Sequence, residues 1–207
     1  MAPPPPLLIL ASASPRRSAL LSQIGVPHRI VHAHIDERRG VAESVEHCVR
    51  RLAEQKARHV CSQLRDAAAA IDARAGNALP VLGADTAVVI DEAMLGKPRD
   101  RAEALAMLAR LSGREHAVIS AVSLAHGGTV HSRLSRSLVR FRVLDRAECE
   151  AYWATGEPRG KAGGYAIQGL GAVFVATLQG SYSAVMGLPL FETAALLAAA
   201  GVPVWQA

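Results

Sequence analysis

The chain has 207 residues, of which 50% are hydrophobic and 20% charged, and its formal net charge is +5. This composition excludes an intrinsically disordered chain, because a half-apolar sequence can bury a core, and the length suits one domain or two small lobes. The basic balance favours an anionic partner such as a nucleotide, a nucleic acid or a phosphorylated metabolite. The three cysteines form no CxxC pair, and this sparse usage is typical of a reducing compartment.

The N-terminal segment predicts a protein of the cytoplasm. Residues 1–6 contain a proline run without basic residues, and the apolar stretch that follows is too short for a signal peptide or a membrane span. We expect this segment to be a stiff, disordered lead-in to a single domain that covers residues 1–207.

Hydrophobic patterning predicts an α/β protein with mixed strand directions. We expect Asp85 to break the third strand, and His126-Gly127-Gly128 to form a hairpin turn. Asp100 and Glu103 suit a capping box at the start of a helix that Gly113 ends. The predicted strands cover 7–11, 28–33, 80–90, 115–125, 129–141 and 172–178. The predicted helices cover 15–24, 44–65, 100–111 and 145–155, and residues 66–79 are expected to form a frayed helix end and a loop. A short helix from 181, a break at 187–189 and a terminal helix are expected to follow.

Residues 12–17, with the sequence Ser-Ala-Ser-Pro-Arg-Arg, form the turn between the first strand and the first helix. Ser14 suits the N-cap and Pro15 the first helical position. Free backbone N–H groups, the helix dipole and two guanidinium groups at one point make a site for an anion, of which phosphate is the obvious one. The alternative is a solvated first turn, which the dipole disfavours because it repels cations there.

A carboxylate stands inside the apolar run 81–90. Burial of the Asp85 charge is costly unless the group is paired, protonated or bound to a metal. A structural ion pair would explain its position. The functional alternatives are a general base or a metal ligand.

A lysine stands on the apolar face of the long helix. At helical spacing, Lys56 projects onto the stripe that contains Val49 and Val60. Its ammonium must therefore reach solvent along its own stem or meet a negative partner. Arg51 and Arg58 project off this stripe, so we expect both to be solvated.

Two loops carry further polar groups. Lys97 precedes Pro98, which holds it extended, so the lysine can project from the loop; a plain surface lysine is the alternative. Residues 161–169 contain paired glycines that permit close backbone approach to a ligand. The Gln168 amide offers a donor and an acceptor that can match the N3–H and a carbonyl of uracil or thymine. A glycine-rich loop without a ligand is the alternative.

The common nucleotide-binding motifs are absent: the sequence has no Walker A motif and no G-x-G-x-x-G, and no pattern of a zinc finger, RNA-recognition motif or helix-turn-helix. A different set of short motifs, taken in order, resembles the Maf family, also called septum-formation proteins. The match runs almost from end to end. Its elements are Leu10–Arg17, Ile35–Glu37, Arg51–Ala57, Gly83–Thr86, Gly96–Asp100, Leu111–Gly113, Lys161–Gly169, Gly180–Ser183 and Val185–Leu190.

The resemblance implies a Maf/ITPase-like α/β fold, with a mixed, elongated central sheet flanked by helices and two lobes with a cleft between them. It implies an enzyme that cleaves a nucleoside triphosphate to the monophosphate and pyrophosphate with a divalent metal cation, Mg²⁺ or Mn²⁺. One branch of the family acts on dTTP and UTP and on modified pyrimidine triphosphates such as 5-methyl-UTP and pseudo-UTP, a house-cleaning activity linked to arrest of cell division. Pyrimidine nucleoside triphosphates are thus the implied partners, a homodimer is the implied assembly, and neither a membrane nor a nucleic acid is expected to bind.

The resemblance also implies the residues of the site. Asp85 is expected to accept the proton of the attacking water, and Glu37 to hold the metal together with Asp85. Arg16, Thr86 and Gln168 match positions tied to substrate choice. The residues implied to bind substrate are Ser12, Arg16, Arg17, Glu37, Lys56, Thr86, Lys97, Lys161 and Gln168.

Two alternatives stay open. A sister branch acts on 7-methyl-GTP, but it tends to have Asp-Gln and a Glu where this chain has Asp85-Thr86 and Gln168. The other alternative is a non-catalytic regulator of septum formation that binds nucleic acid or a division protein, which the basic charge would suit. The chain departs from the family pattern at Gly160, where an Asp often precedes the lysine, and its segment 66–79 is longer than usual.

Overall fold

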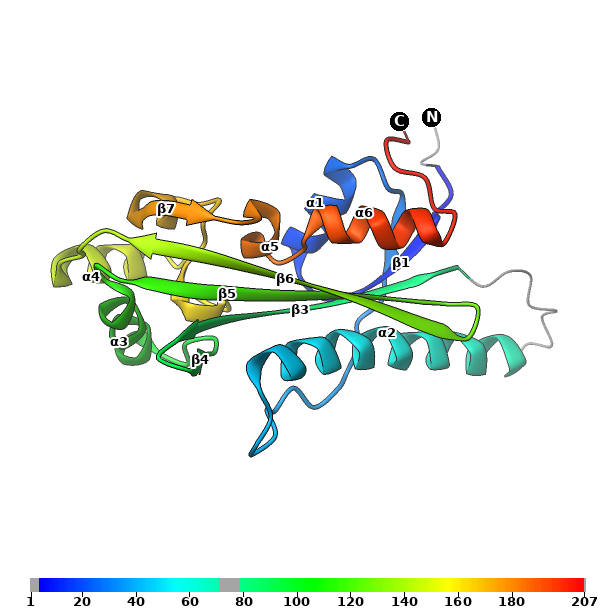
Figure 1. Cartoon of the computed structure of the whole chain (residues 1–207), viewed down its shortest axis with the longest axis horizontal. Coiled ribbons are helices and arrows are strands. Elements are labelled where there is room, and N and C mark those ends of the chain that lie inside the picture. Colours follow the sequence, from blue (N-terminus) through cyan, green and yellow to red (C-terminus); the bar gives the residue numbers. More distant parts are fainter. Residues whose placement is uncertain (1–3, 71–78, 207) are drawn as a thin grey trace. The chain divides into compact units, whose positions relative to one another are not determined.

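The structure is a computed structural model that describes residues 4–70 and 79–206 (Figure 1). The predicted disorder of the lead-in falls partly on residues 1–3, and the predicted loop after the long helix falls mostly on residues 71–78; these lie outside the described residues. Among the residues described, no helix is both long enough and apolar enough to cross a membrane.

Seven strands form one mixed sheet in the order β2-β1-β3-β5-β6-β7, and β4 pairs with β3 outside this path. β1 runs parallel to both β2 and β3, whereas β4 is antiparallel to β3 and β7 is antiparallel to β6. The predicted α/β class with mixed strand directions is therefore confirmed. The strands are β1 (Leu8–Ala11), β2 (His28–Ile30), β3 (Val81–Ile90), β4 (Ala93–Leu95), β5 (Glu115–His126), β6 (Thr129–Phe141) and β7 (Val175–Gln179).

Helices flank this sheet, as predicted, and short 3₁₀ turns precede β7. The helices are α1 (Pro15–Gln23), α2 (Val45–Ala70), α3 (Arg101–Leu111), α4 (Arg146–Ala154), α5 (Tyr182–Met186) and α6 (Leu190–Ala199), and the 3₁₀ turns cover Ala162–Gly164 and Leu170–Phe174.

The chain divides into two compact units; it passes between them in the middle of β3, β5 and β6, and once more at the end of α5. The first unit comprises residues 1–85, 121–134 and 187–207, and the second comprises 86–120 and 135–186. The passage in β3 falls between Asp85 and Thr86. The predicted cleft between two lobes stays a prediction.

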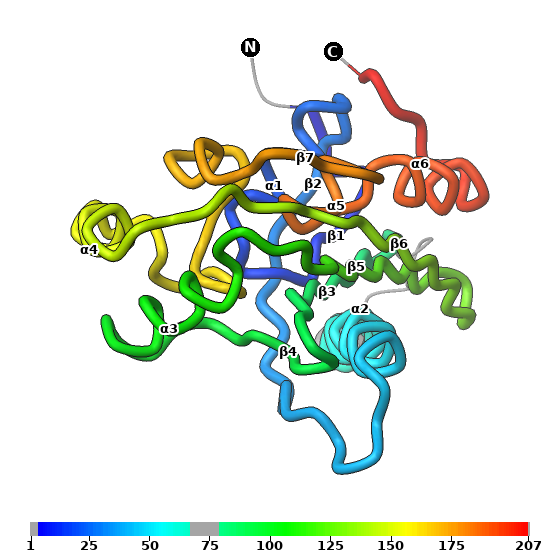
Figure 2. Tube along the Cα trace, turned by 60° about the vertical axis from the view of Figure 1, so that its left-hand side comes forward, coloured from blue at the N-terminus to red at the C-terminus, as the bar shows by residue number. Residues whose placement is uncertain are grey.

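In the first unit, α2 lies along one face of the strands, and α1 and α6 lie on the opposite face (Figures 1 and 2). Ala57 and Val60 of α2 pack against Ile9 of β1 and Val81 of β3 in a small aliphatic core. This contact explains the spacing of the apolar stripe along α2, because each turn of the helix presents one small or branched residue to the sheet.

The second unit contains a larger core, which includes four of the eight Phe, Tyr and Trp residues of the chain. Phe141 makes edge contacts with Tyr165 and His116, at ring centroid distances of 4.8 Å and 5.0 Å. Tyr152 of α4 meets Phe174 edge-on at 4.9 Å. α3 contributes Met107, Leu108 and Leu111 to the same core.

Several local predictions differ from the structure. β3 continues through Asp85 without a break, because the carboxylate finds a cationic partner and the backbone keeps its extended conformation. β2 ends at Ile30, three residues before the predicted end, and α2 continues to Ala70, beyond the predicted Arg65. The strand predicted over 172–178 begins only at Val175, after a 3₁₀ turn.

Two predicted caps are only partly realised. Ser14 occupies the N-cap of α1, but its side chain makes no capping hydrogen bond. Asp100 accepts the backbone N–H of Glu103, whereas the Glu103 carboxylate accepts from the backbone and side chain of Arg99 instead of closing the capping box. A complete capping box occurs at α4, between Asp145 and Glu148.

Candidate active site

The turn between β1 and α1 carries two arginines and one buried hydroxyl, that of Ser12. Ser12 Oγ accepts hydrogen bonds from Arg17 Nη1 at 3.1 Å and from the backbone N–H of Ser14 at 3.2 Å. Arg17 Nε donates to the Gly187 carbonyl at 2.8 Å, which fixes the guanidinium plane. Burial lowers the pKa of both Arg16 and Arg17, although Asp85 and Glu37 act in the opposite sense on Arg17. Since arginine keeps its charge in proteins, these groups concentrate positive charge at the start of the helix.

Lys56 joins two carboxylates. Its Nζ lies 2.6 Å from Glu37 Oε1 and 2.7 Å from Asp85 Oδ1. Lys56 is only 7% exposed. Of the two alternatives, the structure therefore confirms that the ammonium meets a negative partner, and it does not reach solvent along its stem. Glu37 comes from the segment before α2 and Asp85 from the middle of β3, and the side chain of Asp85 is 15% exposed. The site therefore has a carboxylate that is held in place and still reaches solvent.

The pair of carboxylates suits a hard divalent cation. Mg²⁺ keeps several of its waters and is held through one or two carboxylates together with substrate phosphates. Glu37 and Asp85 offer two such groups at one point, beside the Lys56 ammonium. Within the described residues, no group of three His, Cys, Asp or Glu side chains could hold a metal by itself. The donor set thus fits a metal that arrives with a phosphate ligand, rather than a closed protein site.

Thr86 belongs to the second unit and bonds to a serine of β5. Thr86 Oγ1 lies 2.9 Å from Ser120 Oγ, and Ser120 donates its single hydroxyl proton to the Ala184 carbonyl at 2.6 Å. Because a hydroxyl has only one proton to donate, Thr86 is the donor toward Ser120.

The loops that carry Lys97 and Lys161 are joined by their backbones. The N–H of Gly163 donates to the carbonyl of Gly96 at 3.0 Å, which brings the residue before Lys97 next to the glycine-rich segment. Lys97 is exposed and Lys161 is half-buried. Lys161 Nζ donates to the Glu157 carbonyl at 2.5 Å.

A carboxylate that the sequence did not single out anchors the segment around Gln168. Glu157 accepts the Tyr152 hydroxyl at 2.7 Å and the backbone N–H groups of Gly171 and Leu170 at 2.9 Å and 3.0 Å. Burial by itself would raise the pKa of Glu157, but the Gly171 N–H and the other donors bring it below its ordinary value. Gln168 itself is exposed, three residues before the anchored Gly171.

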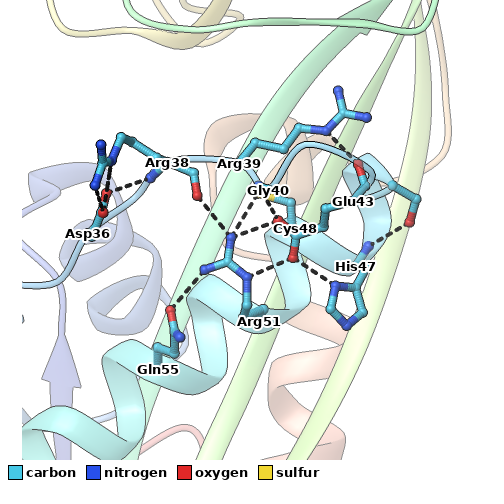
Figure 3. Close-up of polar contacts among 10 residues, drawn as sticks. Asp36, Arg38, Arg39, Gly40, Glu43, His47, Cys48, Arg51 and Gln55 are labelled. Carbon is cyan, nitrogen blue, oxygen red and sulfur yellow. Dashed lines mark hydrogen bonds and ion pairs between the residues drawn. The ribbon is translucent and has the colours of Figure 1, made fainter.

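A second residue that the sequence misjudged is Arg51. We expected it to be solvated, but its side chain is 27% exposed and forms a two-point ion pair with Glu43. The prediction failed because the segment before α2 folds back over the first turns of the helix (Figure 3). The sequence gives only a weak signal for this contact, which is the acidic residue Glu43 shortly before the helix.

The structure thus places the predicted residues in two groups, and the joining of these groups into one site stays a prediction. The first unit carries Ser12, Arg16, Arg17, Glu37, Lys56 and Asp85; the second carries Thr86, Lys97, Lys161 and Gln168.

Comparison with known proteins agrees with the resemblance. A family model described as "Maf-like protein" matches residues 7–200. A protein of Saccharophagus degradans named "dTTP/UTP pyrophosphatase" is 52% identical over 199 residues, which cover 96% of this chain and 91% of the relative. A protein of the same name from Bordetella parapertussis is 48% identical, and the match covers 99% of this chain and 97% of the relative. Another from Alkalilimnicola ehrlichii is 53% identical, and the match covers 93% of this chain and 92% of the relative. With its sheet, its motifs and these relatives, the chain belongs to the Maf family.

Proposed function

We propose that this protein is a nucleoside triphosphate pyrophosphatase that hydrolyses dTTP and UTP to the nucleoside monophosphate and pyrophosphate. The observation that carries the proposal is the contact of Lys56 with both Glu37 and Asp85, next to the Ser12–Arg17 turn in the first unit. Relatives of about 50% identity over nearly the whole chain are named for this activity.

Asp85 acts as the general base. Its carboxylate takes a proton from a water molecule, and the oxygen of that water attacks the α-phosphorus in line with the bond to the bridging oxygen. That bond breaks and pyrophosphate leaves with the electron pair. Lys56, itself buried, holds the Asp85 carboxylate in a fixed orientation through its 2.7 Å contact.

The cations of the site bind the triphosphate and stabilise the charge that develops on it. Arg16, Arg17, Lys56 and Lys97 serve this role, with Lys161 as a further contact, and the Ser12 hydroxyl orients Arg17. A divalent cation, Mg²⁺ or Mn²⁺, held by Glu37 and Asp85, would neutralise phosphate charge when bound.

Base selection rests on Arg16, Thr86 and Gln168. The Gln168 amide donates to a carbonyl of uracil or thymine and accepts its N3–H. Thr86, whose proton goes to Ser120, can add only an acceptor. A guanine base presents two donors on its corresponding edge and would suit a carboxylate better, so 7-methyl-GTP is the less suitable substrate.

We further propose a homodimer in the cytoplasm, with a house-cleaning role toward modified pyrimidine triphosphates that is linked to arrest of cell division. A regulator that works only by binding nucleic acid or a division protein is the competing function. The buried Lys56 and its two carboxylates favour catalysis, because a flat binding surface gives no reason to bury an ammonium group.

The deciding experiment is pyrophosphate release from dTTP, UTP, 5-methyl-UTP, CTP, GTP and 7-methyl-GTP, each with Mg²⁺, with Mn²⁺ and with a chelator. We expect turnover of dTTP and UTP with metal and little turnover of the guanine nucleotides. Absence of turnover for all six would contradict the enzyme, and salt-dependent DNA binding in its place would support the regulator. A preference for 7-methyl-GTP would assign the protein to the sister branch.

A further inference from the structure

The segment that carries Glu37 is tied to the start of α2 by one arginine. Arg51 Nε and Nη2 donate to the two carboxylate oxygens of Glu43 at 2.7 Å and 2.8 Å, and Nη2 also donates to the Arg38 carbonyl at 3.1 Å. Arg38 directly follows Glu37 in the chain. A single guanidinium thus bridges the residue after Glu37 and a residue five positions further along (Figure 3).

Glu43 completes this closure from the other side. Its carboxylate also accepts the backbone N–H of Gly40 at 3.0 Å and lies 2.7 Å from His47 Nδ1, and its side chain is only 9% exposed. The Arg51 guanidinium holds the pKa of Glu43 well below its ordinary range, so the ion pair persists at any physiological pH.

The other contacts of the segment are short-range or made by Glu37 itself: Arg39 Nε donates to the Glu43 carbonyl at 2.6 Å, the Glu43 N–H donates to the Gly40 carbonyl at 3.2 Å, and Glu37 meets Lys56 Nζ at 2.6 Å. The segment contains no helix or strand between β2 and α2, and its residues 36–42 are exposed. The Asp36 carboxylate bonds to the backbone N–H and guanidinium of Arg38, but both side chains are largely in solvent, where ion pairs stabilise weakly. The two-point contact of Arg51 with Glu43 is half-buried and has the geometry in which arginine binds a carboxylate most strongly, so it ties the end of this segment to α2.

We propose that Arg51, acting through Glu43 and the Arg38 carbonyl, is a positioning residue that holds Glu37 beside Lys56 and Asp85. The role of Glu37 as a metal ligand rests on the proposed function, whereas the ordering of residues 36–43 does not. Arg51 and Lys56 both belong to α2. The same helix thus carries the ammonium group of Lys56 and the arginine that holds the Glu37 segment beside it.

The test compares Arg51→Met with Arg58→Met, a matched loss of charge at an exposed position of the same helix. Hydrogen exchange of the backbone amides of residues 36–43 is measured by mass spectrometry, and the Mg²⁺ concentration at half-maximal rate is measured with dTTP. We expect Arg51→Met to speed exchange in this segment and to raise the Mg²⁺ midpoint roughly 10–100-fold, as loss of a group that orients a metal ligand does, with kcat largely restored at saturating Mg²⁺. Arg58→Met changes neither quantity.

Two further variants separate positioning from general stability. Arg51→Lys keeps the charge but cannot form the fork, so its Mg²⁺ midpoint should lie between those of wild type and Arg51→Met. The double variant Glu43→Gln/Arg51→Met should lose less than the sum of the losses in the two single variants, because Arg51 and Glu43 share one ion pair.

An unchanged Mg²⁺ midpoint, or unchanged exchange of 36–43, in Arg51→Met would overturn the positioning role. If the wild type itself releases no pyrophosphate, the proposed function fails, and the exchange measurement still decides whether Arg51 orders the segment.

Discussion

Gly83 of β3 lies so close to α2 that a Cβ atom on it would stand 2.2 Å from the carbonyl oxygen of Ala53 and 2.8 Å from the backbone nitrogen of Ala57. Both neighbours are backbone atoms, which cannot move away as a flexible side chain can. Glycine at this position lets α2 approach β3, and the approach lets Lys56 reach Asp85 two residues further along the strand.

Gly83→Ala should therefore destabilise the protein by about 3 kcal/mol or more, at the upper end of the effects of overpacking. The measurement is urea denaturation followed by circular dichroism. Gly96→Ala is the matched control, because a Cβ atom there meets nothing within 4 Å. Equal stability of the two variants would show that helix and strand are less closely packed than described.

Asp85→Asn should preserve nucleotide binding and remove most turnover. The amide oxygen can still accept from Lys56 Nζ, but it cannot take a proton from water, so we expect kcat to fall roughly 10²–10⁴-fold. The affinity for dTTP is measured by isothermal titration and the rate by pyrophosphate release. Loss of binding with turnover preserved would contradict the assignment of Asp85 as the base.

Gln168→Glu should lower kcat/KM for UTP by roughly 10–100-fold, which corresponds to about 1–3 kcal/mol for a base carbonyl left without its donor. The same change should improve the relative use of 7-methyl-GTP, whose donor edge suits a carboxylate. Rates with both nucleotides are compared with those of wild type. An unchanged ratio would remove Gln168 from base selection.

Glu157→Gln should loosen the segment that carries Gln168. The carboxylate accepts three hydrogen bonds, and an amide in its place presents N–H groups to at least one of the same donors. We expect a higher KM for UTP with a smaller change in kcat. Glu150→Gln, which loses only surface ion pairs with Arg101 and Arg146, is the control and should leave KM unaltered.

His116 should make the protein less stable as the pH falls from 6.5 towards 4. Burial among aromatic rings lowers the pKa of His116 from 6.5 to about 4, so the folded protein keeps this imidazole neutral while the unfolded chain takes up a proton. Each pH unit in this window should reduce the free energy of unfolding by about 1.4 kcal/mol. Above pH 6.5 the contribution of His116 is constant.

The measurement is the free energy of unfolding of wild type and of His116→Gln between pH 4 and 8. In the wild type, His116 Nε2 lies 2.8 Å from the Tyr165 hydroxyl. A glutamine side chain can still form a hydrogen bond with this hydroxyl, but glutamine does not titrate. The difference between the two proteins should shrink as the pH falls. A parallel pH dependence would show that His116 is not the responsible group.

Local signals made much of this fold predictable. The hairpin of β5 and β6 follows from the His126-Gly127-Gly128 turn between two strand-like segments, and the start of α1 follows from Ser14 and Pro15. These features depend on neighbours in the chain, so a single sequence is sufficient to recognise them.

The partners of polar groups were predictable only in kind. The sequence left Lys56 two alternatives, solvent or a negative partner, and it showed that Asp85 needs a reason to be in a strand. Their pairing joins residues 29 positions apart in the chain. Arg51 and Glu157 gave no comparable signal, since an arginine off the apolar stripe and a glutamate before a proline are common on surfaces. Their contacts arise when loops fold back, which periodicity does not describe.

The boundary between the two units falls within β3, between the proposed base and the proposed selector of the nucleobase. Consecutive residues of a strand project to opposite faces, and their Cα atoms are about 3.8 Å apart across a trans peptide bond. Asp85 accordingly meets Lys56 of α2, whereas Thr86 meets Ser120 of β5. The proposed base and the proposed selector are therefore adjacent in the chain, and each has its own neighbours. We therefore expect substitutions around Ser120 to change which base is accepted while the Asp85 carboxylate stays in place, and changes in the packing of α2 to alter the rate without altering the choice of base.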